Sequence, residues 1–225
     1  ERQDAYARIA EKLQDRLYEC FCTRKEIAQA PSAPHSDFRP YSGTCRNLTA
    51  AQRAERRKVR PPAWRIRADS ASQEVCDRWL GRVEGAVDDF VVRRNDGVWA
   101  YNFAVVVDDL EQGVDQVCRG EDLLSSAPRQ AWLAKLLGGD PPEYAHVPLV
   151  LGPDGGRLQK RDGAVTLADL SALGMGAAAV RNLLARSLGL ASPGEDASMS
   201  ALLERFDPAI RPSGWRWSPP PRMGG

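Results

Sequence analysis

Hydrophobic and polar positions alternate along this chain with two different periods. Between Tyr6 and Leu17, apolar residues recur every three or four positions with charged residues between them, which predicts an amphipathic helix. From Ala63 the period changes to two, because Trp64 and Ile66 alternate with arginines, and this pattern predicts a strand. The chain therefore combines helical and extended segments, which indicates a fold of the α/β class.

Local signals predict the other elements. The Asn-Asp-Gly turn at 95–97 separates the apolar runs 87–94 and 98–107, which we interpret as a β-hairpin. Capping-box patterns begin at Thr23 and Thr49, and each predicts the start of a helix. Further strands are expected at 114–118 and 146–151, and further helices at 126–137, 167–173, 177–188 and 199–205.

Composition narrows the classes of function. The 225 residues carry a formal net charge of +1, which argues against a globally basic nucleic-acid binder. No apolar stretch approaches the roughly 20 residues that a membrane helix needs, and no secretion signal is visible, so we expect no membrane partner and a cytoplasmic location. The 2 histidines exclude a His-rich metal site, and the 5 cysteines, an odd number, favour a metal or free-thiol role over disulfides.

Three of the cysteines form the first candidate site. Cys20 and Cys22 are separated by one residue, and Cys45 follows downstream. A tetrahedral zinc site needs four nitrogen, oxygen or sulfur ligands, and Tyr41 and His35 are both candidates for the fourth. The alternative interpretation is three buried or free thiols in a reducing compartment.

Other polar clusters carry weaker signals. Cys76 and Cys118 have no cysteine nearby and are expected to be packed thiols. Basic residues crowd the stretch 53–67, which would suit either a phosphate backbone or a solvated helix face. The acidic pairs at 88–89 and 108–109 follow strand-like segments, and we interpret them as turn or solubility residues.

A glycine-rich turn at 152–156 precedes the sequence Leu158-Gln-Lys-Arg161. A loop that carries adjacent cations suits the charge that develops on a transferring phosphate. As a bare pattern this signal is weak, because Lys and Arg often stand beside Gly.

Nine short segments follow one another along the chain: 20–27, 41–46, 89–97, 99–104, 107–109, 117–124, 128–130, 149–155 and 157–161. Taken together, they resemble the glutamyl-queuosine tRNA(Asp) synthetases, which are short relatives of glutamyl-tRNA synthetase. The segments are collinear and cover about residues 1–165. The resemblance implies a class I synthetase Rossmann-type catalytic domain with a zinc-binding insertion and a small C-terminal helical region.

The resemblance also implies an order of parts. Residues 1–19 would end the first Rossmann half, 20–62 would form the zinc-binding insertion, 63–151 the remainder of the catalytic domain, and 152–225 the mobile ATP loop and helical region. The family's preceding half-domain, with its His-containing ATP-binding signature, matches nothing in these residues. We therefore expect the chain to be incomplete at its N-terminus and unable to catalyse alone.

The implied activity is ATP- and Mg²⁺-dependent activation of L-glutamate without tRNA. Transfer of glutamate to the queuosine base at the wobble position of tRNA(Asp) would follow, by a protein expected to be a monomer. Two alternatives remain open: a fragment of an ordinary glutamyl-tRNA synthetase, and a non-catalytic zinc-stapled RNA-binding module that would use the basic stretch.

The resemblance implies three groups of site residues. They are the zinc ligands Cys20, Cys22, Tyr41 and Cys45; the glutamate-binding residues Tyr101 and Arg119; and the ATP loop Arg157, Leu158, Gln159, Lys160 and Arg161. Lys160 matches the catalytic lysine of the mobile loop, whose cation would offset charge at the α-phosphate. Gln159 departs from the family, which often has Ser at that position.

Overall fold

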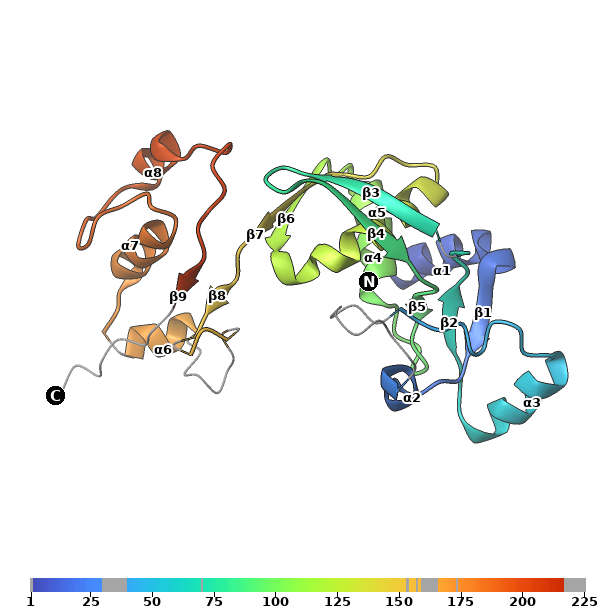
Figure 1. Cartoon of the computed structure of the whole chain (residues 1–225). Coiled ribbons are helices and arrows are strands. Elements are labelled where there is room, and N and C mark those ends of the chain that lie inside the picture. The colour runs from blue at the N-terminus through green and yellow to red at the C-terminus, as the bar shows by residue number, and fades with distance from the viewer. Residues whose placement is uncertain are drawn as a thin grey trace. The chain divides into compact units, whose positions relative to one another are not determined.

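A computed structural model describes residues 2–29, 40–69, 71–152, 154–156, 158, 166–172 and 174–216 (Figure 1). The chain divides into two compact units. The first comprises Glu1–Val117 and Leu123–Ala145, and the second comprises Cys118–Asp122 and His146–Gly225.

The first unit is a mixed α/β structure, as the two sequence periods predict. Its helices are α1 (Gln3–Lys12), α2 (Arg24–Gln29), α3 (Ala50–Val59), α4 (Tyr101–Gln112) and α5 (Ala127–Leu136), with the 3₁₀ helix η1 (Gln14–Arg16). Its strands are β1 (Leu17–Cys20), β2 (Ala63–Ile66), β3 (Ala71–Asp77), β4 (Gly81–Val87) and β5 (Val91–Arg93). The division between the units falls within β6 (Gln116–Gly120), β7 (Glu143–Val147) and the 3₁₀ helix η2 (Glu121–Ser126).

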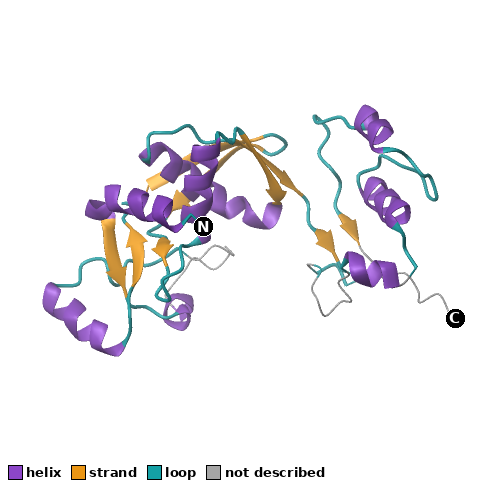
Figure 2. Ribbon diagram, turned by 180° about the vertical axis from the view of Figure 1, so that it is seen from behind, coloured by secondary structure: helices purple, strands orange, loops and turns teal. Residues whose placement is uncertain are grey.

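Two sheets organise these strands. One has the order β1-β2-β5, with both pairs antiparallel. The other has the order β4-β3-β7-β6, in which β3 runs antiparallel to β4 and parallel to β7. Helix α5 packs against α4, β3 and β4, so that helices cover the strands as Figure 2 shows from behind. The main core includes Ile66, Val92, Phe103 and Leu133, none of which is measurably exposed.

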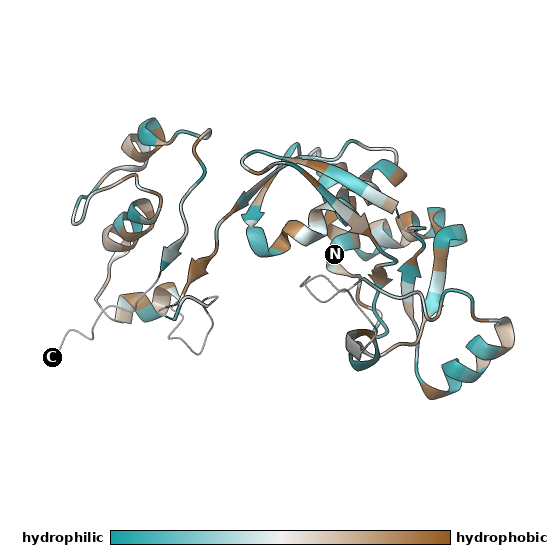
Figure 3. Cartoon of the chain, viewed as in Figure 1, coloured by the Kyte–Doolittle hydropathy of each residue, from teal (hydrophilic) through white to brown (hydrophobic). Residues whose placement is uncertain are grey.

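Two capping boxes confirm the predicted helix starts. Thr49 accepts a hydrogen bond from the Gln52 backbone N–H at 3.2 Å, and the Gln52 side chain accepts one from the Thr49 backbone N–H at 2.8 Å. Thr23 and Glu26 form the same reciprocal pair ahead of α2. Helix α3 is largely hydrophilic in Figure 3 and is held at its start by this capping rather than by buried residues of its own.

The expected strand at 98–107 is wrong. The turn before it does form, with Gly97 at φ 83° and the Arg94 backbone N–H donating to the Val98 carbonyl at 2.8 Å. After the turn, the chain forms a single antiparallel bridge, between Arg93 and Trp99, in place of the expected second strand. Helix α4 then begins at Tyr101. The apolar run satisfies a helical period as well as a strand, because its buried residues fall on one helical face.

The second unit contains the predicted C-terminal helices. They are α6 (Leu167–Ala172), α7 (Ala177–Ser187) and α8 (Met199–Arg205), and the short strands β8 (Val150–Leu151) and β9 (Trp215–Arg216) pair in parallel. Ala185, Ala197 and Leu202 form its buried cluster. Within the described ranges, no helix combines the length and the apolar character that crossing a membrane requires.

Candidate functional site

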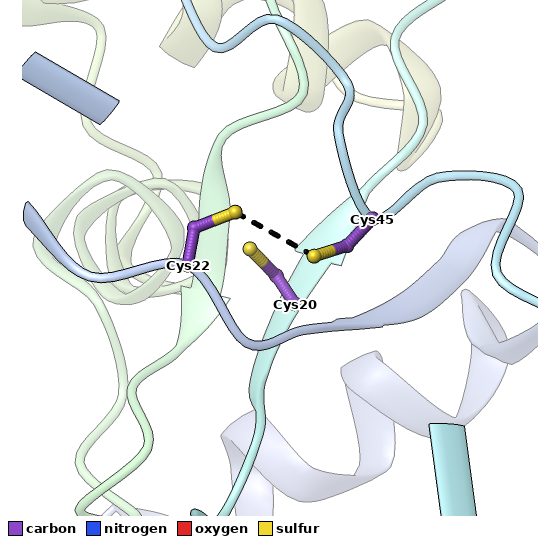
Figure 4. A group of neighbouring side chains, drawn as sticks. All are labelled: Cys20, Cys22 and Cys45. Carbon is purple, nitrogen blue, oxygen red and sulfur yellow. Dashed lines mark hydrogen bonds between the residues drawn. The ribbon is translucent and has the colours of Figure 1, made fainter. Parts of the chain in front are cut away.

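Three cysteines lie together at the end of β1. Cys20 is the last residue of that strand, Cys22 follows two positions later, and Cys45 lies in the turn that precedes α3. Their sulfur atoms all lie within 4.8 Å of one another, and the Sγ atoms of Cys22 and Cys45 are 3.5 Å apart. Figure 4 shows the three side chains converging from these separate segments. The structure thus brings together the cysteines that the sequence analysis grouped.

Tyr41 adds an oxygen atom to this cysteine cluster. Its hydroxyl lies 3.4 Å from Cys20 Sγ and 3.5 Å from Cys22 Sγ. The same oxygen accepts a hydrogen bond from the Cys45 backbone N–H at 2.9 Å, and the residue is buried. The rival fourth ligand, His35, lies outside the described residues, so the choice between the two stays a prediction.

Three distances within this cluster are compatible with a tetrahedral metal site. Zinc–sulfur bonds of about 2.3 Å and zinc–oxygen bonds of about 2.0 Å place neighbouring donor atoms roughly 3.5–3.8 Å apart. The sulfur–oxygen contacts of 3.4 and 3.5 Å and the sulfur–sulfur contact of 3.5 Å agree with that spacing. The residues present therefore fit a structural zinc ion with closed coordination.

The electrostatics of the cluster differ from one donor to the next. Burial raises the pKa of the Cys22 thiol to about 12. Burial also opposes ionisation of Cys20, but the hydrogen bond with Tyr41 and the charge of Arg65 outweigh it, so that the pKa of this thiol is lowered. Burial and the hydrogen bonds with both thiols raise the pKa of Tyr41. A bound divalent cation would lower the pKa of every one of these groups and so oppose the effect of burial, because it favours the anionic ligand.

Asp88 anchors the loop that carries Tyr41. One carboxylate oxygen of Asp88 accepts a hydrogen bond from the Tyr41 backbone N–H at 2.7 Å, and the other accepts one from Arg129 Nε at 2.6 Å. The Asp88 side chain is 8% exposed and that of Arg129 is 14% exposed. The expected turn or solubility role is therefore wrong for Asp88, which forms a nearly buried ion pair behind the cysteine cluster.

Asp89 is also buried, and it connects three segments. Its carboxylate accepts hydrogen bonds from the Tyr18 hydroxyl at 2.7 Å and from the Ala68 backbone N–H at 2.9 Å. It also pairs with Arg46, whose Nε lies 3.1 Å from Asp89 Oδ2. Burial and the Asp89 carboxylate raise the pKa of Tyr18. The solubility role expected for Asp89 is wrong as well, and neither acid of this pair lies in an open catalytic position.

Some arginines of the basic stretch 53–67 form contacts within the protein. Arg57 donates from Nε and Nη2 to the two carboxylate oxygens of Glu19, at 2.9 and 2.7 Å, and the Glu19 side chain is only 6% exposed. Arg60 donates to the Phe21 carbonyl at 3.2 Å. These contacts tie α3 to the strand that ends at the cysteine cluster, which weakens the interpretation of the stretch as a free phosphate-binding face.

The two residues implied for glutamate binding lie in different units. Tyr101 is the first residue of α4 in the first unit and is 52% exposed. Arg119 lies in β6, in the part that belongs to the second unit, and its Nε donates to His146 Nε2 at 3.1 Å. His146 is fully buried in β7. The sequence analysis did not single out this histidine, because one apolar-flanked His carries no recognisable pattern.

Some predicted site residues cannot be compared with the structure. Arg157, Gln159, Lys160 and Arg161 lie outside the described residues, and of the predicted ATP loop only Leu158 is described.

Cys76 and Cys118 contradict their expected burial. Both thiols are exposed. Cys76 lies at an exposed position of β3 and Cys118 at an exposed position of β6, because alternate residues of these strands face outward.

Comparison with known proteins places these features in a family. Residues 1–203 match the family described as tRNA synthetases class I (E and Q), catalytic domain. The Glutamyl-Q tRNA(Asp) synthetase of Nocardia farcinica is 58% identical over 198 residues, which cover 87% of this chain and 62% of that protein. The protein of the same name from Symbiobacterium thermophilum is 42% identical over 221 residues, which cover 94% of this chain and 68% of that protein. This chain thus spans roughly two thirds of the length of these relatives.

Solved structures agree with the sequence comparison. A glutamate tRNA ligase from Elizabethkingia meningosepticum, crystallised in complex with its amino acid, matches with a TM-score of 0.72 and 26% identity over 96% of this chain and 50% of that chain. The glutamate-tRNA synthetase from Elizabethkingia anophelis matches with a TM-score of 0.73 and 27% identity, over 97% of this chain and 51% of that chain.

Proposed function

Since the chain belongs to the class I (E and Q) tRNA synthetase family, we propose that it is part of an enzyme that activates L-glutamate with ATP and Mg²⁺ and transfers it to the queuosine base of tRNA(Asp). The observation that carries this proposal is the set of relatives at 42–58% identity that bear the name Glutamyl-Q tRNA(Asp) synthetase. The matching glutamate–tRNA ligases are 26–27% identical, so the ordinary synthetase is the weaker alternative.

The proposed reaction has two group transfers. In the first, a carboxylate oxygen of glutamate forms a bond to the α-phosphorus of ATP, and pyrophosphate leaves. In the second, the acceptor group of the queuosine base forms a bond to the activated carbonyl carbon, and AMP leaves. Lys160 is proposed to offset the negative charge that builds up at the α-phosphate, as a cation beside a transferring phosphate does.

Glutamate binding is proposed for Tyr101 and Arg119. A guanidinium offers a carboxylate two parallel N–H donors, and a phenol offers one directed hydroxyl. The contact between Arg119 and His146 supports this role, because a hydrogen bond from Arg119 Nε to a buried side chain restricts the orientation of the guanidinium. Arginine nitrogens only donate hydrogen bonds, so His146 Nε2 is the acceptor in this contact.

We expect His146→Leu to raise the KM for glutamate by roughly 10- to 100-fold, since a lost hydrogen bond to a charged group is worth about 1.5–3 kcal/mol. The KM for ATP is expected to stay unchanged. The measurement is glutamate-dependent ATP–pyrophosphate exchange with the full-length gene product. His146→Gln, which keeps an acceptor near the Nε2 position, serves as the matched variant and is expected to retain most of the glutamate affinity. Equal increases in both KM values would instead indicate a general packing role.

Zinc is proposed as a structural metal held by Cys20, Cys22, Tyr41 and Cys45. The ion would join the end of β1 to the loop before α3, and it would supply cross-linking rather than reaction chemistry.

The fourth ligand can be tested by substitution. Tyr41→Phe removes the oxygen donor and is expected to lower zinc affinity by at least about 10-fold, measured by competition with a chromogenic chelator. His35→Ala is the paired variant and is expected to leave the affinity unchanged. The reverse result, with zinc lost from His35→Ala and kept by Tyr41→Phe, would assign the ligand to His35.

The whole proposal is tested by exchange and transfer assays with the full-length, zinc-loaded gene product. Glutamate-dependent ATP–pyrophosphate exchange is expected without tRNA, and glutamate transfer is expected only to queuosine-containing tRNA(Asp). Transfer to tRNA(Glu) would favour an ordinary glutamyl-tRNA synthetase. An absence of exchange would favour the zinc-stapled RNA-binding module.

A further inference from the structure

A buried arginine lies beside the cysteine cluster. Arg65 is in β2, directly opposite Tyr18 in the antiparallel pairing with β1, while Ala63 is opposite Cys20. Opposed residues of an antiparallel pair project to the same face, and so do residues two apart in one strand. Arg65 therefore shares a face with Tyr18 and Cys20, the face that carries the candidate metal ligands. It is 6% exposed.

The guanidinium of Arg65 lies against the proposed oxygen ligand. Its central carbon is 3.7 Å from the ring centroid of Tyr41, well within the range of a cation–π contact. Arg65 Nη1 donates to the backbone carbonyl of Asp89 at 2.6 Å, which fixes the plane of the group. The side chain is thus held at one orientation on the ring whose hydroxyl points into the cysteine cluster.

The charge of Arg65 has no carboxylate partner within the described part of the chain. Its Nε is buried without a hydrogen-bond partner there. The Asp89 carboxylate pairs with Arg46, and the Asp89 atom that accepts a hydrogen bond from Arg65 is the backbone carbonyl oxygen. Glu19, the buried acid of β1, is next to Cys20 in the strand, so it faces the other side, where it pairs with Arg57. A buried cation without a counter-ion is costly, so a source of negative charge is needed nearby.

The metal site would supply that charge. Cysteine binds metals as the thiolate, so three cysteines around a divalent cation leave an excess of one negative charge even with a neutral tyrosine. The geometry points to Arg65 as the buried counter-cation of the cysteine–tyrosine metal site, a positioning residue that acts through the ring of Tyr41. This inference rests on the proposed zinc site and adds a residue to it.

The proposal predicts that one substitution affects the zinc-loaded and the metal-free protein to different extents. Arg65→Met keeps most of the side-chain volume and removes the charge. It is expected to lower zinc affinity by about 10- to 100-fold, as loss of an outer-shell partner does. In the metal-free protein the same substitution removes a buried cation that has no carboxylate partner among the described residues and loses the hydrogen bond to the Asp89 carbonyl, so its Tm is expected to fall less than that of the zinc-loaded form. A residue that only packs would lower the Tm of both forms alike.

The experiment uses the full-length gene product, with and without EDTA treatment. Zinc affinity is measured by chelator competition, and the ligand set is read from the thiolate charge-transfer bands of the Co²⁺-substituted protein. Arg65→Lys, which keeps the charge, is expected to retain zinc affinity within about threefold, and it remains informative if Arg65→Met does not fold. Arg93→Met is the control. Arg93 also lies over an aromatic ring, that of Trp99 at 5.1 Å, but Trp99 is not one of the proposed metal ligands, so this variant is expected to leave zinc affinity unchanged.

Several results would overturn the proposal. They are unchanged zinc affinity in Arg65→Met, an equal fall in Tm for its zinc-loaded and metal-free forms, or a loss in Arg65→Lys as large as that in Arg65→Met. Failure of the zinc site itself is recognised separately, because the parent protein would then bind no zinc and show no thiolate bands with Co²⁺, and the role of Arg65 would fall with it.

Discussion

Replacing Cys45 with alanine is expected to abolish stoichiometric zinc binding by the full-length protein. The substitution removes one of the four direct ligands of a structural site. Its cost in zinc affinity is expected to exceed the roughly 100-fold that loss of an outer-shell partner costs. Because Cys45 is 2% exposed and also accepts a hydrogen bond from the Phe21 backbone N–H at 3.4 Å, its loss also frees the end of β1. Zinc per chain, measured by mass spectrometry after desalting, is expected to fall from about one to near zero.

Stability is expected to fall together with metal content. Binding of a structural zinc contributes on the order of 10 kcal/mol in small zinc domains, and part of that free energy stabilises the folded protein. Chelation of the parent protein should therefore lower its Tm, whereas chelation of the Cys45→Ala variant should change little. Cys76→Ala is the matched control, since Cys76 is an exposed thiol outside the cluster. Full zinc occupancy in Cys45→Ala would contradict the ligand assignment.

The cysteine cluster shows what sequence spacing can predict. The two residues Cys20 and Cys22 flank a single position at a strand end, so the backbone itself keeps them close, and the third cysteine needs only one loop to return to them. Most of what is needed to predict this cluster therefore lies in the local sequence. The capped helix starts at Thr23 and Thr49 were predictable for the same reason, because a capping box is complete within four residues.

The residues around the cluster were not predictable from local patterns. In the stretch from Trp64 to Arg67, a period of two assigns the apolar residues to the core and the arginines to solvent. Ile66 follows this rule, but Arg65 is 6% exposed while Trp64 is 37% exposed. The strand is covered on the arginine face by the loop that carries Tyr41, and that contact joins residues 24 positions apart in the chain. Only tertiary structure reveals it.

The error at 98–107 has a different origin. Continuous apolar runs fit a buried strand and a buried helix equally well, so periodicity alone does not separate them. The turn at 95–97 favoured a hairpin, and the turn is present. The outcome was decided by packing, because Phe103, Val106 and Val107 of α4 all enter the main core on one helical face.

Asp89→Asn is expected to destabilise the protein by about 3 kcal/mol, the lower end of the cost of breaking a buried ion pair from one side. The Asp89 side chain is 7% exposed and that of Arg46 is 24% exposed, so water solvates poorly the Arg46 charge that loses its partner. An amide also cannot accept from all three partners, Tyr18, Ala68 and Arg46, because one of its two heavy atoms is a donor. Urea unfolding of the metal-loaded, full-length protein measures the difference in free energy.

The same arginine provides the control for this prediction. Arg46 Nη2 also donates to Asp69 Oδ1 at 2.6 Å, and the Asp69 side chain is 68% exposed. Asp69→Asn removes an equal charge from the same partner, and asparagine tolerates the φ of 55° at this position. Exposed pairs contribute less than about 1 kcal/mol, so this variant is expected to unfold almost like the parent. If both variants lost the same free energy, the cause would be the loss of an ion pair with Arg46, because Asp69 shares that pair but neither the burial of Asp89 nor its hydrogen bonds with Tyr18 and Ala68.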